Sequence, residues 1–193
     1  MQLENTQLNY HQAINMLKYA EILYSETQIQ NKIITLAHEI QQDLDKEQQI
    51  PIFLPVMNGG MFFAVDLLKH LTGPFMLDYI HASRYGNEHF GSSHITWFRQ
   101  PNIENIRGKT VYIIDDILDE GYTLIEIKRF LLNAGAKDCK IIVLIDKDIN
   151  KIKPITANYV GFNAPNKFLF GYGLDLDNLY RQLTNIYIYT NES

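Results

Sequence analysis

The sequence predicts an α/β protein whose core is a parallel sheet flanked by helices. Residues 111–114 form a short β-branched and aromatic run, and apolar residues at helical spacing follow it from Leu124. Residues 50–56 form a second apolar run, after which helical spacing resumes at Met61. Residues 140–146 add a third buried strand. Strands that alternate with helical segments are typical of parallel sheets, so these observations indicate the fold class.

The composition favours one globular domain. The chain has 193 residues, and 46% of them are hydrophobic, which is enough for one sizeable core. We expect a single domain, 1–193, with a helical amino-terminal part (about 9–46), a core (about 50–150) and a carboxy-terminal segment (about 158–190). Cys139 is the single cysteine, which excludes an internal disulfide and fits a cytoplasmic location.

Charge and hydropathy exclude two classes of partner. The net charge is -5 and the pI is near 5.6, so the chain has no general basic field that would hold nucleic acid. The amino terminus lacks the pattern of a signal peptide, and no stretch approaches the roughly 20 apolar residues of a membrane span. We therefore expect neither nucleic acid nor a membrane as a partner.

The amino-terminal part, residues 9–46, is predicted to be helical. Apolar residues at helical spacing form one face over 13–24 and a second face over 29–44. Ser25 and Gln28 have the spacing of a capping box, which marks the start of a helix. Core packing is the default role of these helices, and a partner-binding surface is the alternative that the sequence leaves open.

The apolar run at 50–56 ends in a second strand-loop-helix junction. The loop is Met-Asn-Gly-Gly, residues 57–60. Taken alone, a glycine pair of this kind is often only a tight turn. Residues 75–81 predict the next strand, and the polar, glycine-containing segment 82–94 is too long for a tight hairpin. By itself that segment predicts a flexible loop that extends from the sheet between two strands.

Two smaller features accompany this segment. His89 and His94 lack a third ligand at helical spacing, so we do not predict a metal site there. Trp97 and Phe98 are expected to anchor the strand that returns to the core.

The junction after 111–114 contains the densest chemistry. An apolar strand leads into Asp115 and Asp116, and Gly121 and Thr123 open the following helix. Ligands bind at this position in open α/β sheets, because loop amides and the helix dipole attract anions there. Carboxylates would repel a phosphate unless a cation or hydroxyl groups lay between them. A ribose phosphate with a bound divalent metal meets both demands, whereas the plain alternative is acids that cap a helix or face water.

The chain after 140–146 supplies further candidates. Lys147 follows that strand directly, although a lysine in this position is usually solvated. It lies at the same sheet edge as the junction before Thr123, which would bind a phosphate. The aromatic segment 159–175 is rich in glycine, and 186–189 alternates as a final strand. Aromatic residues in such a run belong more often to a core than to a ligand site.

The segment containing the acid pair resembles the 5-phosphoribosyl-1-pyrophosphate (PRPP) signature of type I phosphoribosyltransferases. That signature runs two acids, two apolar residues, Asp, any residue, Gly, any residue and Thr. The resemblance implies that Asp115 and Asp116 approach the ribose hydroxyls, directly or through metal and water. It implies that Asp119 is the catalytic acid or base at purine N7. The backbone that would hold the 5'-phosphate comprises Asp119, Glu120, Gly121, Tyr122 and Thr123.

Two loops resemble the pyrophosphate-binding parts of purine phosphoribosyltransferases. In the first, the resemblance implies pyrophosphate contacts from Met57, Asn58 and Gly59, with a cis peptide between Met57 and Asn58. In the second, the 82–94 segment would close over the site as a lid. The lid residues that would cover the pyrophosphate are Ser83, Arg84 and Tyr85.

The carboxy-terminal segment resembles the hood of hypoxanthine-guanine phosphoribosyltransferases. It contains Val-Gly-Phe, Pro-x-Lys-Phe and Gly-Tyr-x-Leu-Asp, followed by Tyr-Arg. The resemblance implies that Lys147 reads the exocyclic oxygen of a 6-oxopurine, that Phe168 stacks on the base and that Leu169 meets its edge. Asp175 would bind magnesium, with Asp115 and Asp116 as further metal ligands, and Arg181 would contact pyrophosphate. A small hood built from both chain ends completes this fold.

The resemblance implies a transferase of purine salvage. Its reaction would join the phosphoribosyl group of PRPP to hypoxanthine or guanine, giving IMP or GMP and pyrophosphate, with Mg²⁺ as cofactor and a homodimer or homotetramer as assembly. A relative that prefers xanthine or adenine is one alternative. A PRPP-binding regulator is another, and the acidic balance of the chain argues against it. A phosphoacceptor receiver domain also pairs acids with a later lysine, but there the acids end the first strand of the domain.

Overall fold

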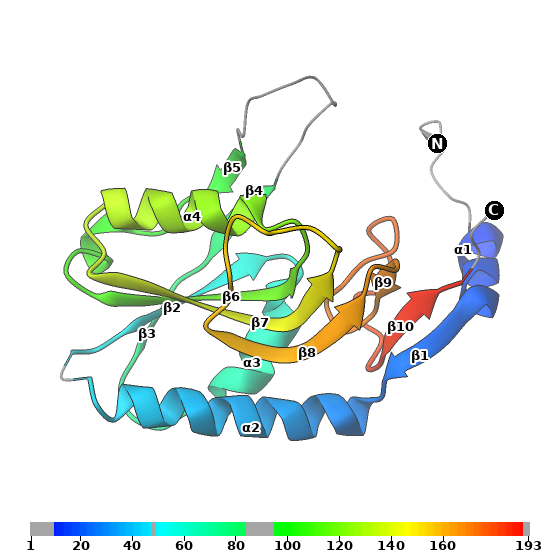
Figure 1. The fold of residues 1–193 in the computed structure, drawn as a ribbon, viewed down its shortest axis with the longest axis horizontal. Coiled ribbons are helices and arrows are strands. Elements are labelled where there is room, and N and C mark those ends of the chain that lie inside the picture. The colour runs from blue at the N-terminus through cyan, green and yellow to red at the C-terminus, as the bar shows by residue number, and fades with distance from the viewer. Residues whose placement is uncertain (1–9, 48, 84–94, 191–193) are drawn as a thin grey trace.

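The computed structural model describes residues 10–47, 49–83 and 95–190 (Figure 1). Its helices are α1 (Tyr10–Met16), α2 (Glu26–Leu44), α3 (Gly60–Leu68) and α4 (Tyr122–Asn133), with 3-10 turns η1 (Leu17–Tyr19) and η2 (Ile103–Asn105). Its strands are β1 (Ala20–Tyr24), β2 (Ile52–Met57), β3 (Met76–Leu77), β4 (Ile80–Ser83), β5 (Thr96–Arg99), β6 (Thr110–Leu118), β7 (Asp138–Asp148), β8 (Tyr159–Pro165), β9 (Leu169–Phe170) and β10 (Ile186–Tyr189).

A central, mostly parallel sheet organises the molecule. Its strands lie in the order β5-β4-β2-β6-β7-β8, with β3 beside β2, and β5 is the antiparallel member at one edge. Helix α4 covers one face of the sheet, and α2 and α3 cover the other (Figure 1). The α/β prediction is therefore confirmed.

The core is divided between the two faces by the alternation of side chains along the strands. On β6, Val111 and Ile113 pack into the layer under α4, whereas Tyr112 and Ile114 pack into the layer against α2 and α3. All four side chains are fully buried. Because both faces of the sheet are covered, its central strands are continuous apolar runs, which made them visible in the sequence.

A small second sheet joins the two ends of the chain. Its strand order is β1-β10-β9, and both contacts are antiparallel (Figure 1). Tyr24 at the end of β1 fastens this sheet to the core, because its hydroxyl donates to the Asn163 carbonyl at 2.6 Å and its ring stacks on Phe162 at 4.1 Å between centroids. The predicted hood from both chain ends is thus present.

The prediction of a fully helical 9–46 segment is wrong at residues 20–24. These residues form β1, because pairing with β10 satisfies their backbone groups and their β-branched and aromatic side chains suit a strand. The predicted capping box is confirmed, since the Ser25 hydroxyl accepts from the Gln28 amide and the Gln28 side chain accepts from the Ser25 amide.

The predicted strand 75–81 is interrupted. The Asp78 carboxylate accepts hydrogen bonds from the backbone amides of Tyr79 and Asn102, and these bonds turn the chain between β3 and β4. Of the two residues predicted to anchor the returning strand, Trp97 packs on the Phe130 ring. Phe98 is 55% exposed, and its ring packs against the His81 ring on β4 with the centroids 4.7 Å apart. The segment 84–94 lies outside the described residues.

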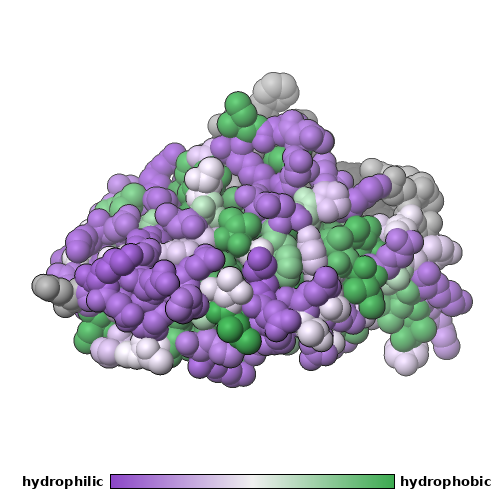
Figure 2. Space-filling view, turned by 60° about the horizontal axis from the view of Figure 1, so that its bottom comes forward, coloured by the Kyte–Doolittle hydropathy of each residue, from purple (hydrophilic) through white to green (hydrophobic). Residues whose placement is uncertain are grey.

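The surface of the molecule is mainly hydrophilic on the face shown in Figure 2. Hydrophobic side chains gather toward the end of this face that carries the small sheet. Within 10–47, 49–83 and 95–190, no helix has both the length and the apolar content needed to cross a membrane.

Candidate active site

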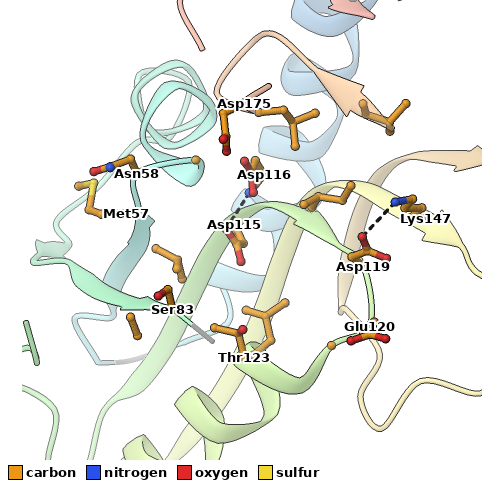
Figure 3. Close-up of a pocket in the computed structure, with 18 of the residues that line it drawn as sticks. Met57, Asn58, Ser83, Asp115, Asp116, Asp119, Glu120, Thr123, Lys147 and Asp175 are labelled. Carbon is orange, nitrogen blue, oxygen red and sulfur yellow. Dashed lines mark hydrogen bonds and ion pairs between the residues drawn. The ribbon is translucent and has the colours of Figure 1, made fainter. Parts of the chain in front are cut away.

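A cavity of about 720 Å³ lies at the carboxyl edge of the central sheet, between the sheet and the hood. It brings together every predicted site residue that the structure describes (Figure 3). These residues are Met57, Asn58, Gly59, Ser83, Asp115, Asp116, Asp119, Glu120, Gly121, Tyr122, Thr123, Lys147, Phe168, Leu169, Asp175 and Arg181. Arg84 and Tyr85 lie outside the described residues.

The junction between β6 and α4 forms the floor of this cavity. Strand β6 continues to Leu118, so Asp115 and Asp116 lie within the strand and not in the loop that the sequence predicted. The loop is only three residues long and ends at Gly121, which has φ 84° as expected for a glycine at this turn. Gly121 has no side chain to cap α4, and the amino-terminal end of a helix attracts anions.

The acid pair is held with little electrostatic compensation. Burial and the charge of the neighbouring Asp116 raise the pKa of Asp115. Burial also raises the pKa of Asp116, and the positive charge of Arg181 opposes part of that shift. Asp116 is 8% exposed, and its backbone amide donates to the Asp115 carboxylate at 3.0 Å. Such acids suit a ligand or cation that supplies the missing positive charge.

The junction between β2 and α3 packs directly against the acid pair. The Met57–Asn58 peptide is cis, as the resemblance implied. A Cβ atom placed on Gly59 would lie 1.9 Å from the Asp116 carboxylate, and one placed on Gly60 would lie 2.7 Å from the Ile114 carbonyl oxygen. Both positions therefore require glycine, and together they hold the loop against β6.

The hood closes this cavity through a second glycine contact. A Cβ atom on Gly173 would lie 2.3 Å from the Gly59 carbonyl oxygen, so only glycine lets the hood approach the loop. Arg181 donates to the Gly173 carbonyl at 2.6 Å and pairs with the Asp175 carboxylate at 2.6 Å. Arg181 thus fixes the hood residues that face the acid pair.

The opposite side of the cavity carries a close ion pair. The Lys147 ammonium donates to the Asp119 carboxylate at 3.0 Å, and the Lys147 side chain is only 13% exposed (Figure 3). Phe168, at the rim, is 50% exposed, whereas Leu169 beside it is buried. A donor, an acceptor and an open aromatic face therefore lie together at this end.

The sequence did not identify the apolar part of this site. Ile117 and Leu174 also line the cavity. Ile117 occupies an apolar position of the PRPP signature, and strand alternation would have placed it on the same face as Asp115, which is a signal that could have found it.

A divalent cation fits the donors of the site, which are carboxylate oxygens of Asp115, Asp116 and Asp175. Across the described parts of the chain, no three His, Cys, Asp or Glu side chains form a metal cage by themselves. Oxygen ligands from a substrate would therefore have to complete the coordination.

Known proteins resemble this chain over most of its length. A family model for the phosphoribosyl transferase domain matches residues 20–177. The hypoxanthine-guanine phosphoribosyltransferase of Bacillus subtilis (strain 168) is 32% identical over 166 residues, which cover 86% of this chain and 91% of that protein. The hypoxanthine-guanine-xanthine phosphoribosyltransferase of Tritrichomonas foetus is 36% identical over 164 residues, which cover 84% of this chain and 87% of that protein.

Solved structures give the same result. The crystal structure of a hypoxanthine-guanine phosphoribosyltransferase from Bacillus anthracis superposes with a TM-score of 0.79 at 34% sequence identity, covering 87% of this chain and 97% of that chain. The matched family region contains the acid pair, both glycine-containing loops, Lys147 and most of the hood. The chain is a transferase that belongs to the phosphoribosyltransferase family, in the group of the hypoxanthine-guanine phosphoribosyltransferases.

Proposed function

We propose that the protein transfers the 5-phosphoribosyl group of PRPP to hypoxanthine or guanine, giving IMP or GMP and pyrophosphate. The observation that carries this proposal is the placement of the Lys147–Asp119 pair in the same cavity as the acid pair and the anion-binding loop. A reaction in purine salvage follows from these substrates.

Each part of PRPP has a complementary region in the cavity. The loop from Asp119 to Gly121 and the start of α4 would hold the 5'-phosphate through backbone amides and the Thr123 hydroxyl. Met57 and Asn58 lie on the far side of the cavity from Lys147, with the acid pair between them (Figure 3). The ribose would therefore lie over the acids, with pyrophosphate toward Asn58 and the purine toward Lys147.

Lys147 and Asp119 would recognise the purine. The ammonium group has three donors, so Lys147 can donate to the purine oxygen at C6 while it keeps its bond to Asp119. The Asp119 carboxylate would accept or return the proton at N7. Phe168 would stack on the ring and the Leu169 backbone would meet its edge. Adenine has an amino donor at C6, which would face the Lys147 donor.

The chemistry requires charge and position more than covalent help. Breaking the bond at ribose C1' creates positive charge on the sugar, and the Asp115 and Asp116 carboxylates would lie beneath it. Arg181 would neutralise part of the departing pyrophosphate. Mg²⁺, held by Asp115, Asp116 or Asp175 together with PRPP oxygens, would supply a Lewis acid that stabilises the leaving group. Ser83, with Arg84 and Tyr85, would cover the pyrophosphate and exclude water.

The test uses the unmodified protein with PRPP and Mg²⁺. Addition of hypoxanthine or guanine should release pyrophosphate in step with IMP or GMP, and excess chelator should stop the reaction until Mg²⁺ is restored. Absence of pyrophosphate release with both purines would overturn the proposal. Full activity in chelator would remove the metal role of the three carboxylates.

Three further properties belong to this proposal. We propose a homodimer or homotetramer and a cytoplasmic location, as expected from the sequence. Xanthine shares the oxygen at C6 and differs at C2, so the segment near Leu169 and Asp175 would decide its use. Light scattering and turnover with xanthine would test the assembly and the base range.

A further inference from the structure

A single lysine outside the family motifs joins the two strands that carry the purine end of the site. Lys153 lies in the segment between β7 and β8, and its side chain is 12% exposed. Its ammonium donates to the Leu118 carbonyl oxygen at 2.6 Å and to the Asp146 carboxylate at 2.5 Å. A largely buried ammonium with two such acceptors is a fixed feature and not a mobile surface charge.

The two acceptors occupy a special place in the sheet. Leu118 and Asp146 are the last pair in the register of β6 with β7. Beyond them Asp119 leaves the sheet, while β7 continues through Lys147 beside β8. Lys153 therefore cross-links the strands at the point where they separate, one residue before each member of the Lys147–Asp119 pair.

The same segment also borders the phosphate loop. A Cβ atom on Gly121 would lie 3.0 Å from the Ile155 side chain and 3.6 Å from the Pro154 ring. The residues after Lys153 thus pack beside the turn that opens α4. The segment 153–155 contacts the loop from both of its ends, at Leu118 and at Gly121.

We propose that Lys153 is a positioning residue. It sets the distance between the Asp119 carboxylate and the Lys147 ammonium, and so holds both groups where they would contact the purine. This inference rests on the function proposed above. Without the ammonium, the Leu118 carbonyl loses this side-chain donor, and the start of the loop loses one of its ties to β7, beside the Lys147–Asp119 pair. Because a displacement of about 1 Å at a reacting group can cost roughly 100-fold in rate, a loosened loop should be visible in kinetics.

The experiment compares Lys153→Met with Lys151→Met as a matched control. Lys151 is an exposed lysine of the same segment, so its replacement removes the same charge without touching the two strand ends. At saturating PRPP, Lys153→Met should lower kcat/KM for hypoxanthine by roughly 10- to 100-fold, whereas Lys151→Met should change it by less than about 2-fold. The dissociation constant for PRPP, measured without purine, should change by less than about 3-fold, because helix amides hold the phosphate. Lys153→Arg should recover most of the activity, since arginine can donate to both acceptors.

A second readout is independent of turnover. Backbone amides of residues 119–123 should exchange with deuterium faster in Lys153→Met than in Lys151→Met or the unmodified protein. Unchanged exchange together with unchanged kcat/KM would overturn the positioning role. A loss of kcat/KM for hypoxanthine that is accompanied by weaker PRPP binding and a lower melting temperature would also overturn it. That result would mean that Lys153 supports the stability of the fold in general. If amide exchange is faster in Lys153→Met but the unmodified protein shows no turnover, the proposed function is overturned. The role of Lys153 in holding the two strand ends together is then still supported.

If Lys153→Met does not fold, Asp146→Asn replaces it. This variant keeps an oxygen acceptor but removes the charge that holds the ammonium. It should show a smaller change of the same kind in both readouts, and wild-type values in both would overturn the proposal.

Discussion

Carboxylates at the two edges of the central sheet have opposite electrostatic environments. At the amino edge, Asp43 accepts a hydrogen bond from the Tyr159 hydroxyl and lies beside Lys46 and Lys140, which lowers its pKa to about 2. At the carboxyl edge, burial and the charge of the neighbouring acid raise the pKa of Asp115. The comparison separates an acid whose charged form the protein itself stabilises, Asp43, from an acid whose charge the protein leaves poorly compensated, Asp115.

The largest expected effect concerns the acid nearest Lys147. Asp119→Asn should lower kcat by about 10²- to 10⁴-fold, because an amide cannot exchange the proton at N7. PRPP binding should change much less, since in the proposed binding mode backbone amides and Thr123 hold the phosphate. Steady-state kinetics and PRPP titration measure the two effects, with Asp148→Asn on the exposed end of β7 as the control. Loss of PRPP binding along with the rate would make Asp119 structural.

A second variant separates function from stability at the acid pair. Asp115→Asn keeps the oxygen that accepts from the Asp116 amide but removes a half-buried charge. We expect at least about 10-fold lower turnover, with stability unchanged or higher by at most on the order of 1 kcal/mol, because a half-buried charge beside a second carboxylate disfavours folding. Thermal unfolding and pyrophosphate release provide the measurements. A clear loss of stability would show that the acid supports the fold.

The reverse result is expected at the amino edge. Asp43→Asn should leave turnover unchanged and lower the free energy of unfolding by less than about 1 kcal/mol, since this side chain is 37% exposed and its ion pairs are screened by solvent. Chemical denaturation at pH 7 measures the change. An Asp43→Asn variant with altered turnover would break the division between the two edges.

The two acids should also give opposite pH dependences of stability. The folded-state pKa of Asp43 is lowered from 3.8 to about 2, so its contribution is full above 3.8 and is lost as pH falls through about 2. The folded-state pKa of Asp115 is raised above 3.8, so this acid costs stability as pH rises through its folded-state pKa. Denaturation of both variants across acidic pH should show differences of opposite sign from the unmodified protein.

The smallest effect concerns the single cysteine. Cys139 is 1% exposed, and burial raises the pKa of its thiol to about 12. The native protein should therefore react with thiol reagents at neutral pH only as it unfolds, and reagent treatment should not reduce turnover. Rapid labelling of the folded protein would contradict this burial.

Much of the carboxyl edge could be predicted because its constraints are local. The apolar runs of β2, β6 and β7 are buried on both faces, and Gly121 must take a positive φ before α4. Motifs of this kind identify the residues that line a site. They do not predict where a strand ends. Strand β6 extends four residues beyond the predicted 111–114, because its pairing with β7 continues to Leu118.

The features that the sequence did not reveal depend on distant partners. Residues 20–24 form a strand only because β10, from the other end of the chain, pairs with them. Asp78 interrupts the strand 75–81 through the amide of Asn102. Lys153 donates to Leu118 and Asp146, and no local pattern marks a lysine whose acceptors lie on other elements.

The most direct test of the central claim is the choice of base by the unmodified protein. With PRPP and Mg²⁺ at saturation, pyrophosphate release should be robust with hypoxanthine and guanine and lower by roughly 100-fold or more with adenine, because the adenine amino group would face the Lys147 donor without an acceptor. Efficient conversion of adenine would contradict the assignment of Lys147 and the account of this edge as a site for 6-oxopurines.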